Sequence, residues 1–204
     1  MKRYILYSII LIMLLSLTTA FAENQQKKEG KLKNKKIVMI IAPLQFHGTE
    51  FEESKDIFNR EGAKIIVACS TLTDANSGSF PQFIVKPDIL INDVQVKDYD
   101  AVVFIGGWGC NEYVDNPIVH KIAKQAVAQG KILAVIELAP TILANAGVLN
   151  GKKATASRSH ILKQKGAIYT GEHVERDGNI ITASGPNAAT EFGEAIVLAL
   201  SEQK

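Results

Sequence analysis

Cysteine is scarce in this chain, with two residues in 204, Cys69 and Cys110. Two cysteines can form at most one disulfide, which excludes the class of small secreted domains built on several bridges. The spacing does not show whether their Cα atoms come within bridging range. We expect two unpaired thiols, with Cys69 as a small buried hydrophobe and Cys110 more accessible to solvent.

An excess of charge is also lacking once the N-terminal segment is set aside. Residues 1–22 hold two of the 23 basic residues and none of the 21 acidic ones, so the remainder has a net charge of zero. This balance gives no electrostatic case for a nucleic-acid partner. The lysine-rich run within residues 23–35 is interleaved with Glu, Asn, Gln and Gly, which is typical of a solvated polar linker.

The first 22 residues have the pattern of an export signal. Lys2 and Arg3 precede an apolar stretch from residue 4 to 17, and Ala20-Phe21-Ala22 forms a small-x-small cleavage pattern. We expect cleavage after Ala22 and a periplasmic or secreted protein with no membrane association beyond this signal. An uncleaved anchor is the alternative, because the segment approaches the ~20 residues that span a bilayer.

Strand-like and helix-like segments alternate along the rest of the chain, which is long enough for one domain, residues 36–204. Continuous apolar runs of strand length separated by helices predict an α/β fold, a flavodoxin-like three-layer sandwich with a mostly parallel central sheet and helices on both faces. The expected strands are 36–42, 64–70, 100–107 and 131–137, with a β excursion over 83–96 and a hairpin over 173–184. The expected helices are 49–62, 116–130, 140–149 and 188–200.

The loops after the predicted core strands are the expected ligand-binding region, because such sheets bind ligands at the carboxyl ends of their strands. These loops contain His47 to Glu50, Gly106 to Cys110, and Glu137 to Pro140. Glu137 ends the run AVIE and precedes a helix that starts at Pro140. A carboxylate therefore lies at the carboxyl end of a predicted strand, where many α/β proteins place a nucleophile.

Four segments together resemble the ThiJ/PfpI family, also called the DJ-1 family, of the class I glutamine amidotransferase-like superfamily. They are FHGTE (46–50), VVFIGG (102–107), the segment from AVIELAP to residue 155, and the C-terminal stretch 174–200. The resemblance covers roughly residues 36–200. It puts the family's glutamate at Glu50 and implies a homodimer.

Glu137 stands where the resembled family has its reactive cysteine. Other positions differ too: Leu138 sits where many members have histidine or alanine, Ser157 falls near a histidine or tyrosine, and Ser184 replaces an arginine. The family's hydrolase, glyoxalase and deglycase chemistry needs a thiolate. The leading hypothesis is therefore a non-enzymatic or small-molecule-binding member, and the rival is a hydrolase or lyase that acts on small carbonyl compounds.

A pair formed by Glu50 and Glu137 admits several roles if the family geometry holds. Two like charges in one site should raise one pKa, and the helix N-terminus should favour an anion at Glu137. The pair could share a proton structurally, act as general acid and base, or bind a cation with His47. Glu137 could also imitate the sulfinate form of the family's cysteine.

The remaining candidates are residues expected to line the pocket for a small polar ligand. We expect no metal and no cofactor. In relatives, the amides of the Gly-Gly turn help to form an oxyanion site. The predicted lining residues are His47, Gly106, Gly107, Trp108, Cys110, Leu138, Ser157 and Ser184.

Overall fold

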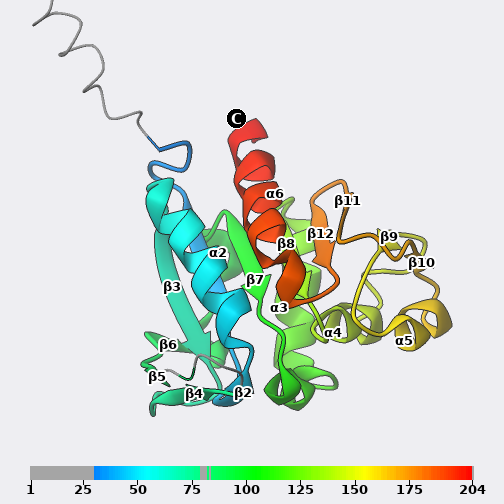
Figure 1. Cartoon of the computed structure of the whole chain (residues 1–204), viewed down its shortest axis with the longest axis horizontal. Coiled ribbons are helices and arrows are strands. Elements are labelled where there is room, and N and C mark those ends of the chain that lie inside the picture. The colour runs from blue at the N-terminus through cyan, green and yellow to red at the C-terminus, as the bar shows by residue number, and fades with distance from the viewer. Residues whose placement is uncertain (1–29, 79–81, 83, 204) are drawn as a thin grey trace, which may run out of the picture. The chain divides into compact units, whose positions relative to one another are not determined.

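A seven-stranded sheet forms the centre of the computed structural model, which describes residues 30–78, 82 and 84–203 (Figure 1). The strand order is β11-β12-β8-β7-β1-β3-β6. All neighbouring pairs are parallel except β11 and β12, which form the predicted antiparallel hairpin. The strands are β1 (Lys36–Ile40), β3 (Lys64–Cys69), β6 (Ile89–Leu90), β7 (Ala101–Phe104), β8 (Ile132–Ile136), β11 (Val174–Asp177) and β12 (Ile180–Ala183).

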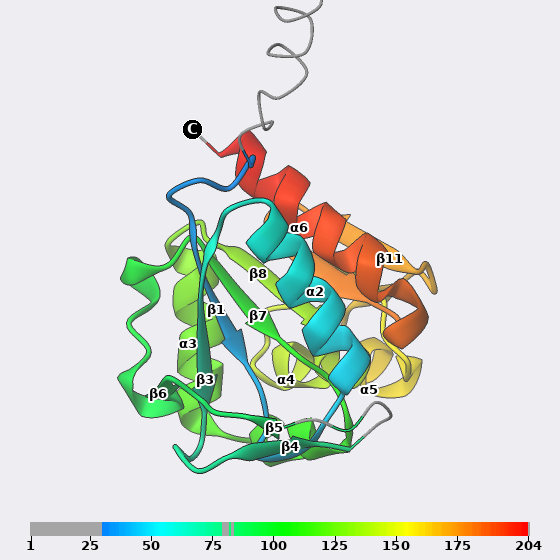
Figure 2. The ribbon, with the colours of Figure 1, turned by 60° about the vertical axis from the view of Figure 1, so that its left-hand side comes forward.

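Helices cover both faces of this sheet, which confirms the predicted α/β class with a mostly parallel sheet. Figure 2 shows α2 (Gly48–Arg60) and α6 (Ala189–Glu202) side by side over one face. The other face packs against α3 (Pro117–Ala128) and α4 (Pro140–Asn145). Asn116 caps α3, accepting hydrogen bonds from the amides of Ile118 and Val119, while Pro117 occupies the first turn.

The central strands are apolar on both sides because successive side chains point to opposite faces. Val38 and Ile40 of β1 belong to the core on the α3 face, whereas Ile37 and Met39 belong to the core beneath α2 and α6. The same alternation holds along β7 and β8. This explains why these segments read as continuous hydrophobic runs rather than alternating ones.

Short elements complete the fold, and most of them were not predicted. The expected β excursion over 83–96 is wrong beyond Leu90, because residues 91–93 and 96–98 are 3-10 turns. The unpredicted elements are β2 (Leu44–Phe46) and β4 (Ala75–Ser77), which join β5 (Ile84–Val85) in a small sheet, the pair β9 (Lys153–Ala154) and β10 (Ile168–Tyr169), and α5 (Ser159–Gln164).

The predicted linker extends too far into the folded unit. Leu32 is fully buried in the core beneath α2 and α6, and its amide donates to the carbonyl of Glu61 at 2.8 Å. The compact unit therefore begins at Lys31 rather than at residue 36. The predicted signal segment 1–22 and linker residues 23–29 lie outside the described residues. Within the described ranges, no helix is both long and apolar enough to cross a bilayer.

Candidate functional site

Glu137 forms a strained elbow immediately after β8. Its φ is +65°, a left-handed conformation that costs a non-glycine residue roughly 1–2 kcal/mol. The backbone is held on both sides: the Glu137 amide donates to the Ala183 carbonyl at 3.0 Å, and the Glu137 carbonyl accepts from the amide and the hydroxyl of Ser157, both at 3.0 Å. Backbone strain of this kind persists only where the surroundings over-determine it, and it concentrates at functional sites.

The carboxylate of Glu137 is bound by the protein's own backbone. A single oxygen, Oε2, accepts from the amide of Gly107 at 2.7 Å and from the amide of Leu138 at 3.0 Å. Hydrogen bonds from amides to a charged oxygen are stronger than those between neutral groups. The two amides come from different segments, the turn after β7 and the elbow after β8, so the Glu137 side chain ties these segments together.

Glu50 lies in the first turn of α2 and has no solvent exposure. Its Oε2 accepts from the amide of Gly106 at 3.0 Å, and its Oε1 has no hydrogen-bond partner among the described residues. Burial first, and then the negative charge of Glu137, raises the pKa of Glu50 well above its ordinary value, while the Gly106 amide opposes the shift. Glu50 therefore keeps its proton to a higher pH than an exposed glutamate does.

The raised pKa agrees with the expected coupling of the pair, but the geometry differs from a shared proton. In the described part of the chain no hydrogen bond joins Glu50 to Glu137; the two carboxyl groups instead accept from the consecutive amides of Gly106 and Gly107. A Cβ on Gly106 would lie 2.7 Å from the Glu137 Cβ and 2.7 Å from the Ile136 carbonyl oxygen. Glycine at position 106 is thus required for the close approach of the Glu137 side chain and the Ile136 carbonyl.

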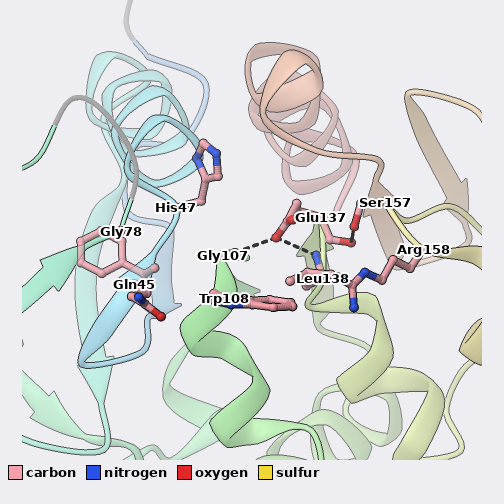
Figure 3. Close-up of a pocket in the computed structure, with 10 residues that line it drawn as sticks. Gln45, His47, Gly78, Gly107, Trp108, Glu137, Leu138, Ser157 and Arg158 are labelled. Atoms are coloured by element: carbon pink, nitrogen blue, oxygen red, sulfur yellow. Dashed lines mark hydrogen bonds between the residues drawn. The ribbon is translucent and has the colours of Figure 1, made fainter.

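A pocket of about 390 Å³ opens beside Glu137. Figure 3 shows Glu137 between Gln45, His47 and Gly78 on one side and Ser157 and Arg158 on the other. The lining residues are Gln45, Phe46, His47, Gly78, Gly107, Trp108, Glu137, Leu138, Ser157 and Arg158.

Six of the ten residues predicted for the site line this pocket, and four do not. Those present are His47, Gly107, Trp108, Glu137, Leu138 and Ser157. Gly106 and Glu50 are buried and do not line the pocket; the Gly106 amide donates a hydrogen bond to the Glu50 carboxyl group. Ser184 is half-buried, donates its amide to the carbonyl of His173, and is not among the lining residues.

The expectation that Cys110 is accessible is wrong. The turn after Gly107 continues as a 3-10 helix, Trp108–Tyr113, which directs Cys110 into the core with 0 % exposure. Burial, together with the charges of Glu137 and Glu50, raises the pKa of this thiol far above its ordinary value. Cys69 is buried as predicted, and both cysteines are free.

Sequence reasoning missed four lining residues: Gln45, Phe46, Gly78 and Arg158. Arg158 directly follows the predicted Ser157, and its guanidinium lies 5.0 Å from the centre of the Trp108 ring, a cation–π contact. Adjacency to Ser157 was the signal that could have identified it. Gln45 lies on the short strand β2, which carries too few residues for a sequence pattern.

His47 precedes α2 and is half-buried at the pocket edge. Burial lowers its pKa, and the negative charge of Glu137 opposes this shift only in part. The structure gives the cation-binding role of Glu50, Glu137 and His47 no support, since no three His, Cys, Asp or Glu side chains are grouped for a metal within residues 30–78, 82 and 84–203.

Comparison with known proteins gives a consistent result. The sequence profile of the DJ-1/PfpI family matches residues 35–199. An uncharacterised protein of Methanocaldococcus jannaschii is 34% identical over 207 residues, covering 99% of this chain and 98% of the relative. A glutathione-independent glyoxalase of Caenorhabditis elegans is 25% identical over 167 residues, 80% of this chain and 87% of the relative.

A solved structure supports the same relationship. The crystal structure of a ThiJ/PfpI domain protein from Brachyspira murdochii superimposes with a TM-score of 0.81 and 30% sequence identity. The match covers 84% of this chain and 99% of that one. The likeness therefore extends over most of this chain and nearly all of that one.

Proposed function

Because the chain belongs to the DJ-1/PfpI family, and with it to the class I glutamine amidotransferase-like superfamily, we propose that it is an exported, non-enzymatic member that binds a small polar molecule. In this proposal Glu137 replaces the elbow cysteine on which the family's chemistry depends. The ligand enters the pocket beside Glu137.

This proposal rests on one observation: the Glu137 carboxylate accepts hydrogen bonds from the amides of Gly107 and Leu138. Amides in such a position can stabilise the oxyanion of a reacting carbonyl group, but only when they are free to donate to it. Here their donors are already engaged by an anion of the protein itself. A reacting carbonyl oxygen would have to displace that carboxylate, so the arrangement suits binding rather than acyl or carbonyl chemistry.

No other thiol is placed to act instead. The nucleophilic form of cysteine is the thiolate, which needs a lowered pKa and access to substrate. Cys110 is fully buried with a raised pKa, and Cys69 is fully buried in the opposite core. Both are therefore passive core residues.

The alternative is a hydrolase or lyase in which Glu50 and Glu137 transfer protons on a small carbonyl compound. The raised pKa of Glu50 favours it, since a carboxyl group that keeps its proton to higher pH can serve as a general acid. Access argues against it, because Glu50 has no solvent exposure and is not among the residues that line the pocket.

Methylglyoxal turnover by the purified protein tests the choice. We expect no activity in the native protein or in Glu137→Gln, and activity in Glu137→Cys, where the thiol stands beside amides that it leaves free. Glu137→Cys combined with Glu50→Gln is the matched control for the family mechanism. Activity in the native protein that disappears in Glu50→Gln would replace the binding proposal with the carboxylate enzyme.

Export and assembly are separate parts of the proposal, each with its own test. Export is supported by the charged, apolar and small-residue order of residues 1–22. Expression in a host with an export pathway should give a mature protein that begins at Glu23, as read by mass spectrometry. An intact Met1 on a cytosolic product would contradict it.

A homodimer is proposed from the family resemblance. Sedimentation equilibrium of the purified protein should return twice the mass of one chain. A mass equal to that of one chain at micromolar concentration would contradict the dimer, without affecting the binding proposal.

A further inference from the structure

The pocket has an electrostatic pattern that indicates the kind of molecule it accepts. Of its described lining residues, Glu137 and Arg158 carry opposite formal charges, and Gln45 and Ser157 are neutral. The pKa of His47 is lowered by burial, so its ring is predominantly uncharged at neutral pH. A negative group and a positive group thus lie on the same cavity, with neutral polar and apolar groups between them.

Glu137 offers an unused acceptor. Its Oε2 takes both amide hydrogen bonds, whereas its Oε1 has no hydrogen-bond partner among the described residues. The complementary ligand group is an N–H donor, and a cationic ammonium group makes the strongest such bond.

Arg158 offers unused donors at the rim. Its guanidinium is exposed and stacked 5.0 Å from the Trp108 ring centre, and it makes no hydrogen bond or ion pair with a described side chain. Stacking positions the planar group and leaves its N–H donors free at the edges. The complementary ligand group is a carboxylate, which a guanidinium can bind through two parallel hydrogen bonds.

We infer that the pocket binds a free amino acid, with its ammonium group on Glu137 Oε1, its carboxylate on Arg158 and its side chain against Trp108 and Leu138. The inference rests on the proposed binding function and adds the chemical class of the ligand. A volume of about 390 Å³ suits a compact molecule of this size. Because Glu137 and Arg158 have opposite charges, the pocket also disfavours molecules that carry only an ammonium group or only a carboxylate.

The chain contains its own reporter, since Trp108 is its one tryptophan and lines the pocket. We would titrate the native protein with each of the twenty standard amino acids, following tryptophan fluorescence and confirming hits by calorimetry. The best amino acid is then compared with its N-acetyl and its methyl ester derivatives. Each blocked derivative should bind about tenfold or more weakly, because each loses one charge-assisted hydrogen bond.

Two variants test which residue binds each charged group of the amino acid. Glu137→Gln should abolish the preference for the free amine over the N-acetyl derivative and leave the preference for the acid over the ester. Arg158→Ala should do the reverse. Arg176→Ala is the matched control, since Arg176 pairs with Glu202 and does not line the pocket; it should bind as the native protein does. Thermal melting checks that each variant is folded.

Two results would overturn the inference: no amino acid binds the native protein, or the blocked derivatives bind as well as the parent. The comparison within the native protein decides this even if a variant fails to fold. Methylglyoxal turnover separates the two levels. If the native protein neither consumes methylglyoxal nor prefers amino acids, only the assigned ligand class is wrong. If the native protein consumes methylglyoxal, the proposed non-enzymatic function is wrong.

Discussion

Glu50 and Glu137 are the same chemical group in two contrasting settings. Both accept a hydrogen bond from one amide of the Gly106-Gly107 turn, yet Glu50, in the first turn of α2, is fully buried and Glu137 faces a pocket. The buried carboxyl of Glu50 has one amide donor and a raised pKa, whereas the carboxyl of Glu137 has two amide donors. The contrast shows how the surroundings, rather than the residue type, separate a buried carboxyl group from one that faces a pocket.

The largest expected effect comes from a Cβ placed between the Gly106 turn and the Glu137 elbow. Gly106→Ala places a Cβ 2.7 Å from the Glu137 Cβ and should lower the free energy of unfolding by about 3 kcal/mol, as overpacking does in tight cores. Urea denaturation measures it. Gly130→Ala is the control: its φ of +66° gives strain of about 1 kcal/mol, but its Cβ meets open space. Equal losses at both positions would contradict the required close approach.

The next effect is a pH dependence of stability that results from the raised pKa of Glu50. The folded-state pKa of Glu50 lies well above its ordinary value of 4.5, so protonation favours the folded protein. Its contribution to stability is complete below pH 4.5 and is lost as the pH rises through the folded-state pKa. The free energy of unfolding of the native protein should therefore fall relative to that of Glu50→Gln as the pH increases over this window.

Urea denaturation at a series of pH values gives that difference. Glu52→Gln serves as the control, because Glu52 is an exposed neighbour on α2, and its difference from the native protein should not vary with pH in this way. Glu137→Gln should narrow the pH range over which stability is lost, since it removes a charge that raises the Glu50 pKa. A flat difference curve for Glu50→Gln would mean that Glu50 is ionised like a surface acid.

A smaller effect tests the elbow strain. Glu137→Gly should be more stable than Glu137→Ala by about 0.5–1 kcal/mol, because the left-handed φ costs alanine more than glycine loses in chain entropy. Both variants lose the same carboxylate, so the comparison isolates the backbone. At Ala139, where φ is −61°, glycine should instead be the less stable residue. The same sign at both positions would argue against a strained elbow.

The smallest effect concerns the support of the elbow. Ser157→Ala removes the hydroxyl bond to the Glu137 carbonyl but keeps the amide bond to the same oxygen, so about 0.5–1 kcal/mol should be lost. Ser201→Ala removes a comparable hydroxyl bond to Leu198 on the exposed end of α6 and should change stability by less than about 0.5 kcal/mol. Thermal melting resolves the two.

The core of the molecule was predicted from the sequence more accurately than the loops. The central strands and long helices were predicted to within a few residues, because strands buried on both faces are continuous apolar runs and Asn116-Pro117 marks a helix start. Glu137 was found because it ends such a run. The strands β2, β4, β9 and β10 have two or three residues each, too few for any periodicity.

The errors have physical causes in the loops. Cys110 was expected near solvent because it follows a glycine-rich turn, but the turn winds into a 3-10 helix that points the thiol into the core. Leu32 stands alone among lysines and has no neighbours in sequence to signal burial, yet it packs beneath α2 and α6. Gln45 and Arg158 reach the pocket only through tertiary packing of two separate loops.

One carboxylate oxygen is the common acceptor for the amide protons of Gly107 and Leu138, which lie 31 positions apart in the chain numbering. Rotation of a single side chain therefore frees both protons in one step, without any unfolding of the sheet beneath. The rates at which these two protons exchange with deuterated solvent are thereby linked to each other and to whatever occupies the cavity. The elbow thus provides a built-in kinetic readout of side-chain motion at the site.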